Sequence, residues 1–172
     1  MLKLIGGLLV ISAGQLIGSG MADRLRRRAV ELRWLQTALL FLQTEISYTA
    51  TPLPEALERV SRLVEFPARA LLGYTSMRLL QGSGVTAQEA WEESLQRFER
   101  WSALKDGDLS ILRSLGGALG VSSREEQEKH LLLAREQLRQ GEQAAENERA
   151  RFESMYRYSG LLAGLLLVIV LL

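Results

Sequence analysis

The chain of 172 residues contains no cysteine, a single histidine and only three prolines. The lack of cysteine excludes a disulfide framework, a thiolate metal site and a thiol nucleophile. With one histidine, a catalytic triad of serine, histidine and aspartate would have to use His130. The scarcity of proline, together with abundant Ala, Leu, Glu, Arg and Gln, favours helices that few residues interrupt.

Strand-forming patterns are also scarce, because Val, Ile and Thr are few and never alternate with polar residues over a long stretch. Neither sign of charge dominates: 21 basic residues stand against 20 acidic ones. This balance argues against a general nucleic-acid binder, which usually carries a strong basic excess. The sequence has no phosphate-binding loop, dinucleotide fingerprint, nucleophile elbow or paired-histidine zinc motif. We therefore expect an all-α protein that is not an enzyme and has no cofactor or metal site.

The N-terminal end is hydrophobic, and residues 4–22 carry no charge. This length is enough for a marginal membrane span, which needs about 20 apolar residues. A basic cluster follows at once: Arg24, Arg26, Arg27 and Arg28. By the positive-inside rule, the cluster stays in the cytoplasm and the N-terminus lies outside. Residues 1–22 are therefore predicted to be a transmembrane anchor.

Other interpretations of this end remain open. A cleaved secretory signal peptide also has a basic start and an apolar core, although arginines directly after the core favour an uncleaved anchor. The basic cluster could bind anionic headgroups as well as setting the topology, whereas nucleic-acid binding is the less favoured interpretation. Gly14 and Gly18 have the spacing of a helix-packing motif in membranes, which also arises by chance in a glycine-rich span.

The C-terminal end, "YRYSGLLAGLLLVIVLL", is a second hydrophobic segment. Residues 158–172 carry no charge, and Arg149, Arg151 and Arg157 precede them. Both basic edges therefore face one compartment, and both termini point out of it. We predict a short second transmembrane segment over 158–172, with a half-inserted tail as the alternative.

Residues 23–157 between these ends are predicted to form one cytoplasmic helical domain. Apolar residues from Leu32 to Ile46 recur in steps of three and four, which is the spacing of a helix seam. Because nothing breaks the chain before Leu32, a single helix is expected to run from the anchor into the domain. A similar seam from Leu131 to Phe152, interrupted by Gly141 and Glu148, predicts a long last helix that continues into the tail.

Four shorter amphipathic helices are expected between the two long ones. Their boundaries are predicted from capping and breaking residues. These are Thr51 with Pro52, Pro67, Thr86 with Glu89, Asp106 or Asp108, Gly120, and Ser123 with Glu126. The fold class predicted is thus all-α, an antiparallel bundle of about six helices whose long first and last members extend into transmembrane segments.

Four polar residues are candidates for an interface or a structural role: Glu45, Glu125, Glu126 and His130. Glu45 lies beside apolar positions, so a buried ion pair with an arginine of another helix is favoured over catalysis. Glu125 and Glu126 lie in the first turn of the last helix, where the helix dipole favours acidic groups. His130 is expected to be half-exposed near Glu126, and the alternative is a pH-sensitive or proton-transfer group. A membrane-bound enzyme or regulator that uses Glu45 or His130 is the second hypothesis, and pore-lining terminal helices are a third.

Three stretches carry a resemblance to a known family: "QTEISYTATPLPEAL", "LGVSSREEQEKHLLLAREQL" and "MYRYSGLLAGLLLVIVLL". Together with the anchor and its basic turn, they resemble the stage III sporulation protein AB family over essentially the whole chain. That family belongs to a group of membrane proteins needed for the channel between mother cell and forespore. Its helical domain is similar to the cytoplasmic domains of inner-membrane platform proteins in type II secretion and type IV pilus machines.

The resemblance implies a non-enzymatic platform in the mother-cell membrane that faces the forespore. It implies a partnership with the secretion-type ATPase of the same system, stage III sporulation protein AA, and with other membrane proteins of the channel. Platform proteins generally have two helical domains and three spans, whereas this chain has one domain and two hydrophobic ends. The chain is therefore expected to form homo-oligomers or to rely on a separate multispanning partner. The resemblance supplies no active-site residues.

Overall fold

The computed structural model describes the backbone of residues 2–49, 51–82, 84–120 and 123–171, and the side chains of residues 23–49, 51–82, 84–120, 123–152 and 155. Six helices and no strands occur in this described part, which confirms the all-α prediction. The helices are α1 (Leu2–Ser47), α2 (Leu53–Ser61), α3 (Ala68–Leu80), α4 (Ala87–Glu99), α5 (Asp106–Ala118) and α6 (Arg124–Leu171).

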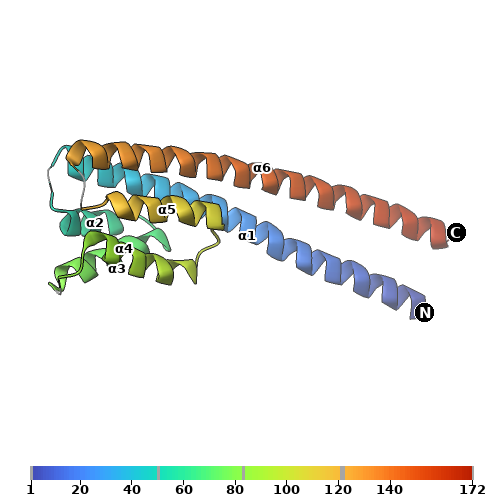
Figure 1. Cartoon of the computed structure of the whole chain (residues 1–172). Helices are drawn as coiled ribbons and strands as arrows, with labels where there is room; N and C mark the ends of the chain where they lie inside the picture. The colour runs from blue at the N-terminus through green and yellow to red at the C-terminus, as the bar shows by residue number, and fades with distance from the viewer. Residues whose placement is uncertain (1, 50, 83, 121–122, 172) are drawn as a thin grey trace.

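The first and last helices run antiparallel and pack side by side, and the four short helices lie against one side of this pair (Figure 1). Both chain ends point away from the short helices in the same direction (Figure 1). We call the end of the domain from which they leave the basal end, and the opposite end, near residue 47, the distal end. Since successive helices alternate in direction, the loops 62–67 and 100–105 lie at the basal end.

The predicted seams form the core of the domain. Leu32, Leu35, Leu39 and Leu42 of α1 are almost fully buried, as are Leu131, Leu138 and Ala145 on α6. Trp91 of α4 is completely buried against α5, where its indole N–H donates to the Leu112 carbonyl at 2.8 Å. The amphipathic spacing of each helix therefore becomes one continuous apolar layer, and burying such side chains is the main driving force for the fold.

Local sequence signals explain several helix ends. Thr86 and Glu89 form the predicted capping box at the start of α4, and Ser123 and Glu126 form the same pair of contacts before α6. Gly120 follows α5 with a φ of +86°, a conformation that glycine adopts without steric cost.

The cap predicted at Thr51 is wrong. The Thr51 hydroxyl donates to the Glu45 carboxylate at 2.8 Å, and α2 begins after Pro52 without a side-chain cap. At the start of α5, Asp108 and not Asp106 is the capping group, because its carboxylate accepts the Lys105 backbone N–H at 2.9 Å. Thr51 bonds to a residue of α1, which local spacing does not reveal, whereas at α5 the structure selects one of the two predicted caps.

Among the described residues, no helix combines the length and apolar character needed to cross a bilayer. The predicted anchor (1–22), the predicted C-terminal segment (158–172) and Arg157 lie outside the residues whose side chains the structure describes.

Candidate functional site

A buried ion pair joins α1 to α5 at the basal end. Arg28 Nε donates to Asp108 Oδ2 at 2.7 Å, and Arg28 Nη2 donates to Asp108 Oδ1 at 3.0 Å. Both side chains are almost completely buried, with 6% of Arg28 and 4% of Asp108 exposed. Arg28, which the sequence places in the predicted basic cluster, is therefore buried inside the domain.

The helical period explains why Arg28 differs from its neighbours. Residues three and four apart share a face of a helix, so Arg28 falls on the stripe that contains Leu25, Leu32 and Leu35. Arg24, Arg26 and Arg27 fall on other faces and are exposed. The sequence shows four similar arginines, but the rotation of the helix assigns one of them to the core.

Room for this pair comes from Gly141 on α6. A Cβ at this position would lie 2.9 Å from Asp108 Oδ1 and 3.6 Å from Leu32 Cδ1. The interruption of the apolar seam at Gly141 therefore has a structural cause, because only glycine lets α6 pass this close to the carboxylate.

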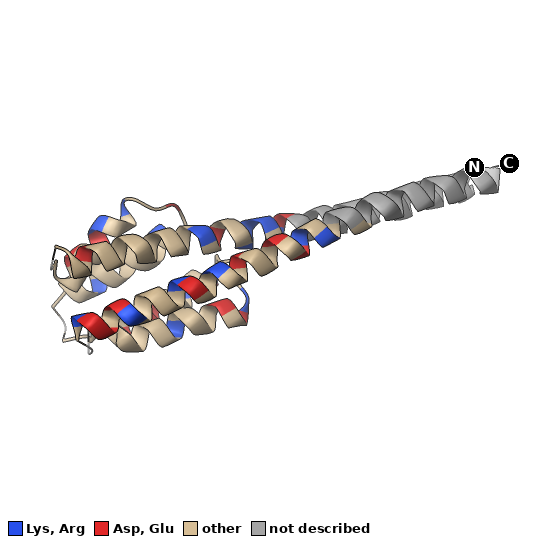
Figure 2. Ribbon diagram, turned by 90° about the horizontal axis from the view of Figure 1, so that it is seen from above, with Lys and Arg blue, Asp and Glu red and all other residues tan. Residues whose placement is uncertain are grey.

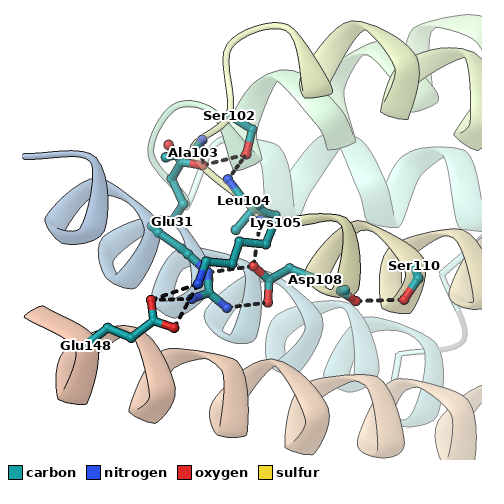
Figure 3. A network of polar contacts seen from close by, with 10 residues as sticks. Glu31, Ser102, Ala103, Leu104, Lys105, Asp108, Ser110 and Glu148 are labelled. Carbon is teal, nitrogen blue, oxygen red and sulfur yellow. Dashed lines mark hydrogen bonds and ion pairs between the residues drawn. The ribbon is translucent and has the colours of Figure 1, made fainter. Parts of the chain in front are cut away.

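Lys105 and Glu148 form an outer layer over the buried pair (Figure 3). Lys105 Nζ donates to both oxygens of Glu148 at 2.8 Å, and Glu148 Oε2 lies 3.7 Å from Arg28 Nη1. The interruption of the seam at Glu148 thus corresponds to a salt bridge between α6 and the start of α5. The hydrogen bonds to Asp108 raise the pKa of Arg28 above its ordinary value, so this guanidinium stays charged.

Glu31 completes the arrangement by holding the loop between α4 and α5. Its Oε2 accepts the Ser102 hydroxyl at 2.6 Å and the Ala103 backbone N–H at 2.9 Å (Figure 3). Burial raises the pKa of this carboxyl above its ordinary value of 4.5. We call the whole set the basal network: Arg28, Glu31, Ser102, Lys105, Asp108 and Glu148.

The chemistry of the basal network is structural. The Asp108 carboxylate is saturated by Arg28 and the Lys105 N–H, so it has no free oxygen positioned for a substrate. In the part of the chain whose side chains are described, no three His, Asp or Glu residues gather as a metal site would require. The network instead fixes α5 and the preceding loop onto the two long helices where these leave the domain.

A cavity of about 1020 Å³ opens beside the network, between the basal ends of α1, α5 and α6. It is lined by polar residues of the network, by exposed arginines and by apolar residues. Its lining includes Arg24, Leu25, Arg28, Lys105, Glu148, Arg151, Phe152 and Met155. The cavity therefore combines cationic and apolar walls next to the exit of both long helices.

The remaining predicted topology residues lie near the same end. Arg151 is exposed and Arg149 is half-buried on α6. Figure 2 shows basic positions on both long helices close to the limit of the described segments. This placement agrees with a basic edge on each helix, although it does not test the predicted topology.

The other predicted polar residues lie at the distal end, away from the basal network. Glu45 accepts hydrogen bonds from Thr51 and Thr49 and pairs with Arg59 of α2 at 3.4 Å. The Thr51 hydroxyl, followed by the other donors, lowers the pKa of Glu45. Glu45 thus joins the end of α1 to α2, as a structural role requires.

Glu125, Glu126 and His130 are exposed at the start of α6. Glu126 is engaged in capping the helix through Ser123.

Sequence analysis missed the basal network as a unit. Arg28 and Asp108 are 80 residues apart, so no local pattern connects them. Two signals were nevertheless present in the sequence. Arg28 and Glu31 lie on the inward stripe of α1, and Gly141 and Glu148 interrupt the apolar seam of α6. Buried charges need partners, so these signals together predict a pairing between helices.

We predict that Glu31→Gln raises the free energy of unfolding relative to the unsubstituted protein, and that this gain grows as the pH rises. Because the folded pKa is raised, Glu31 contributes stability that is fully present below pH 4.5 and is lost as the pH rises through the folded pKa. Glutamine keeps an oxygen that accepts the Ser102 and Ala103 donors without the cost of a buried charge. Chemical denaturation of the full chain in detergent, from acidic to neutral pH, should show the advantage of the variant growing. An advantage independent of pH would contradict this account.

The matched control is Glu89→Gln at the start of α4. Bonds from Thr86 lower the pKa of Glu89, so its contribution to stability is present above the ordinary value and is lost as the pH falls. The two substitutions should therefore change the pH dependence in opposite directions.

We predict that Gly141→Ala destabilises the protein although alanine favours helices. The added Cβ would press on Asp108 and Leu32, and such overpacking costs about 1–3 kcal/mol. The helix-propensity gain of about 1 kcal/mol offsets part of this loss. Gly73→Ala on α3 is the control, because its Cβ would meet only Ser61 at an ordinary 3.7 Å. Equal unfolding midpoints for the two variants would contradict the close approach at Gly141.

The fold and the basal network define a class of protein: a small all-helical domain fastened to a pair of long antiparallel helices. Comparison with known proteins gives the family.

The family model described as "Stage III sporulation protein AB" matches residues 3–172. Stage III sporulation protein AB of Bacillus subtilis (strain 168) is 36% identical over 172 residues, which is 100% of both chains. A solved structure of a stage III sporulation protein AB aligns with a TM-score of 0.68 and 33% identity, covering 73% of this chain and 98% of that one. The chain therefore belongs to the stage III sporulation protein AB family.

Proposed function

We propose that the protein is a membrane-anchored, non-enzymatic platform in a secretion-like channel that crosses the envelope during endospore formation. One observation carries this proposal: the two long helices leave the same end of the domain (Figure 1), and each leads into an uncharged stretch, residues 4–22 or residues 158–172. Family membership supports the connection with sporulation. In this proposal residues 1–22 are a transmembrane anchor and residues 158–172 a second, short membrane segment.

The proposed orientation places the helical domain in the mother-cell cytoplasm and both termini outside. Arg24, Arg26 and Arg27 are exposed directly after the first uncharged segment, which supports this orientation. Arg28, the fourth arginine of the cluster, is buried in its ion pair, and its part in the topology stays a prediction. The membrane would be the one that faces the forespore.

The proposed role in the channel is to couple a cytoplasmic ATPase, stage III sporulation protein AA, to the membrane complex. Support comes from the resemblance to platform proteins of type II secretion and type IV pilus machines. The basal network gives a physical basis for such coupling, because buried charge pairs resist separation once formed. A force applied to the short helices would reach both membrane helices through α5 and the loop before it.

Binding of the ATPase tests the proposal. The full chain in lipid nanodiscs should capture the purified ATPase, whereas empty nanodiscs should not, and the chain alone should not hydrolyse ATP. A failure to capture the ATPase, even when other membrane proteins of the channel are included, would contradict the coupling role.

A sporulation assay tests the competing hypothesis of an enzyme or regulator. Glu45→Gln and His130→Ala should leave sporulation intact. Glu45 bonds to structural partners, and His130 is an exposed residue of α6. Loss of sporulation with either variant, at normal protein levels, would favour that hypothesis instead.

A further inference from the structure

Two large aromatic side chains are exposed at the basal end of the domain. Trp101, directly after α4, is 72% exposed, and Phe66, before α3, is 60% exposed. Trp91, by contrast, is completely buried. Since exposing a tryptophan and a phenylalanine together leaves apolar area in water, a patch of this kind marks a contact surface.

These aromatic side chains lie beside the first turns of α1 after the uncharged segment. Phe66 and Trp101 line one cavity of about 460 Å³ together with Arg26, Arg27 and Val30. Asp23, Glu31 and Pro67 complete its lining. We call the five residues Arg26, Arg27, Val30, Phe66 and Trp101 the basal patch.

The position of the basal patch relative to a bilayer follows from helix geometry. Residues 23–30 rise only about 11 Å along α1, at roughly 1.5 Å per residue. The headgroup layer on each side of a hydrocarbon core is roughly 5–8 Å thick. If the uncharged segment ends in the membrane, the patch lies at or just above the headgroups. The remaining space of about 3–6 Å is less than the diameter of one helix with its side chains, about 10–12 Å, so it is too narrow for a folded partner protein.

The chemistry of the patch fits this position. Tryptophan is enriched at membrane–water interfaces, where its apolar ring and polar N–H are both accommodated. Exposed arginines attract anionic lipids. Val30, at 42% exposed, extends the apolar part of the patch onto α1.

We propose that the basal patch docks on the surface of an anionic bilayer. This docking holds the basal end of the domain against the membrane from which its helices emerge. This inference rests on the proposed membrane attachment. Docking through loops 62–67 and 100–105 adds a second contact beside the long helices, and it fixes how the domain is tilted.

Single-cysteine labelling of the full chain tests the docking directly, because the natural sequence has no cysteine. Trp101→Cys and Phe66→Cys replace exposed side chains, so they are compatible with the fold. Tyr48→Cys, at the distal end and 86% exposed, is the matched control. Each variant carries a polarity-sensitive fluorophore and is reconstituted in vesicles of phosphatidylcholine, with or without phosphatidylglycerol, that contain a headgroup spin label as quencher.

With phosphatidylglycerol, labels at positions 66 and 101 should shift to the blue and be quenched, and the label at 48 should remain water-exposed. Arg26→Gln with Arg27→Gln should weaken the docking equilibrium roughly 30-fold, seen as lost quenching at 101. Position 48 checks that this double variant keeps its orientation, since an inverted chain would change its accessibility to an aqueous quencher.

Other outcomes overturn the inference in distinguishable ways. If the chain resists extraction from vesicles by carbonate but the label at 101 stays in water, docking is wrong and the anchoring stands. If the label is protected only at high protein density, and the unlabelled Trp101→Cys variant forms disulfide cross-links between two chains, a second copy covers the patch instead. If carbonate releases the chain, the membrane attachment itself is wrong, and the proposed function fails with it.

Discussion

Asp108→Ala should destabilise the protein by about 3–5 kcal/mol, the largest single effect we expect. The substitution leaves the buried Arg28 guanidinium without its carboxylate partner. Glu148 does not replace this partner, because its nearest oxygen lies 3.7 Å from Arg28 Nη1. It also removes the acceptor for the Lys105 N–H at the start of α5. Denaturant unfolding of the full chain in detergent, followed by circular dichroism, measures the loss.

A double substitution separates an unpaired charge from a general packing defect. Replacing Arg28 and Asp108 together by Met and Leu should restore most of the stability, because a buried ion pair is often no better than apolar residues of similar volume. The exposed pair Arg139 and Glu136 is the control, and Glu136→Gln should not measurably change stability. If Asp108→Ala behaved like Glu136→Gln, the buried pair would not hold α1 to α5.

Gly116→Ala should be the second most harmful change, with a loss of about 2–3 kcal/mol from overpacking. A Cβ at this position would lie 2.4 Å from Trp91 Cδ1. The ring cannot easily withdraw, because Trp91 is fully buried and donates its indole N–H to the Leu112 carbonyl. Relief of the clash would therefore cost either the hydrogen bond or the fit of the core.

The next residue provides a matched control in the same helix. Gly117 is exposed, and a Cβ there would meet nothing within 4 Å. Gly117→Ala should therefore stabilise the protein by about 0.5–1 kcal/mol. Unfolding midpoints that move in opposite directions for these adjacent glycines would verify the packing of α5 on Trp91; a common direction would contradict it.

The helices could be predicted from the sequence because their signals are local. The stripe from Leu32 to Ile46 and the capping box of Thr86 and Glu89 act within a few residues, and both are present in the structure. The polar contacts could not be predicted in the same way. Arg28 and Asp108 are 80 residues apart and meet only where α1 lies beside α5, so their pairing depends on the tertiary arrangement.

The candidate site was predicted only in fragments. Glu45 has the expected arginine partner on another helix, Arg59 of α2, but the pair is not buried, because the Arg59 side chain is exposed. His130 is exposed on α6, next to the buried seam residues Leu131 and Ala134. The candidate site therefore lies at the basal end and not among the predicted distal residues. Glu31 and Gly141 could not be predicted as part of it, because both contact residues of other segments.

The membrane topology of the full chain tests the central claim most directly. Single cysteines at Lys3, Tyr48 and Ser110 are introduced into a sequence without natural ones, and protoplasts that express each variant are treated with an impermeant maleimide. Tyr48 and Ser110 are exposed on the domain, so protection there reports the compartment and not burial. The account predicts that position 3 reacts in intact protoplasts, and that positions 48 and 110 react only after permeabilisation. Labelling of positions 48 and 110 in intact protoplasts would contradict a cytoplasmic domain anchored at both ends.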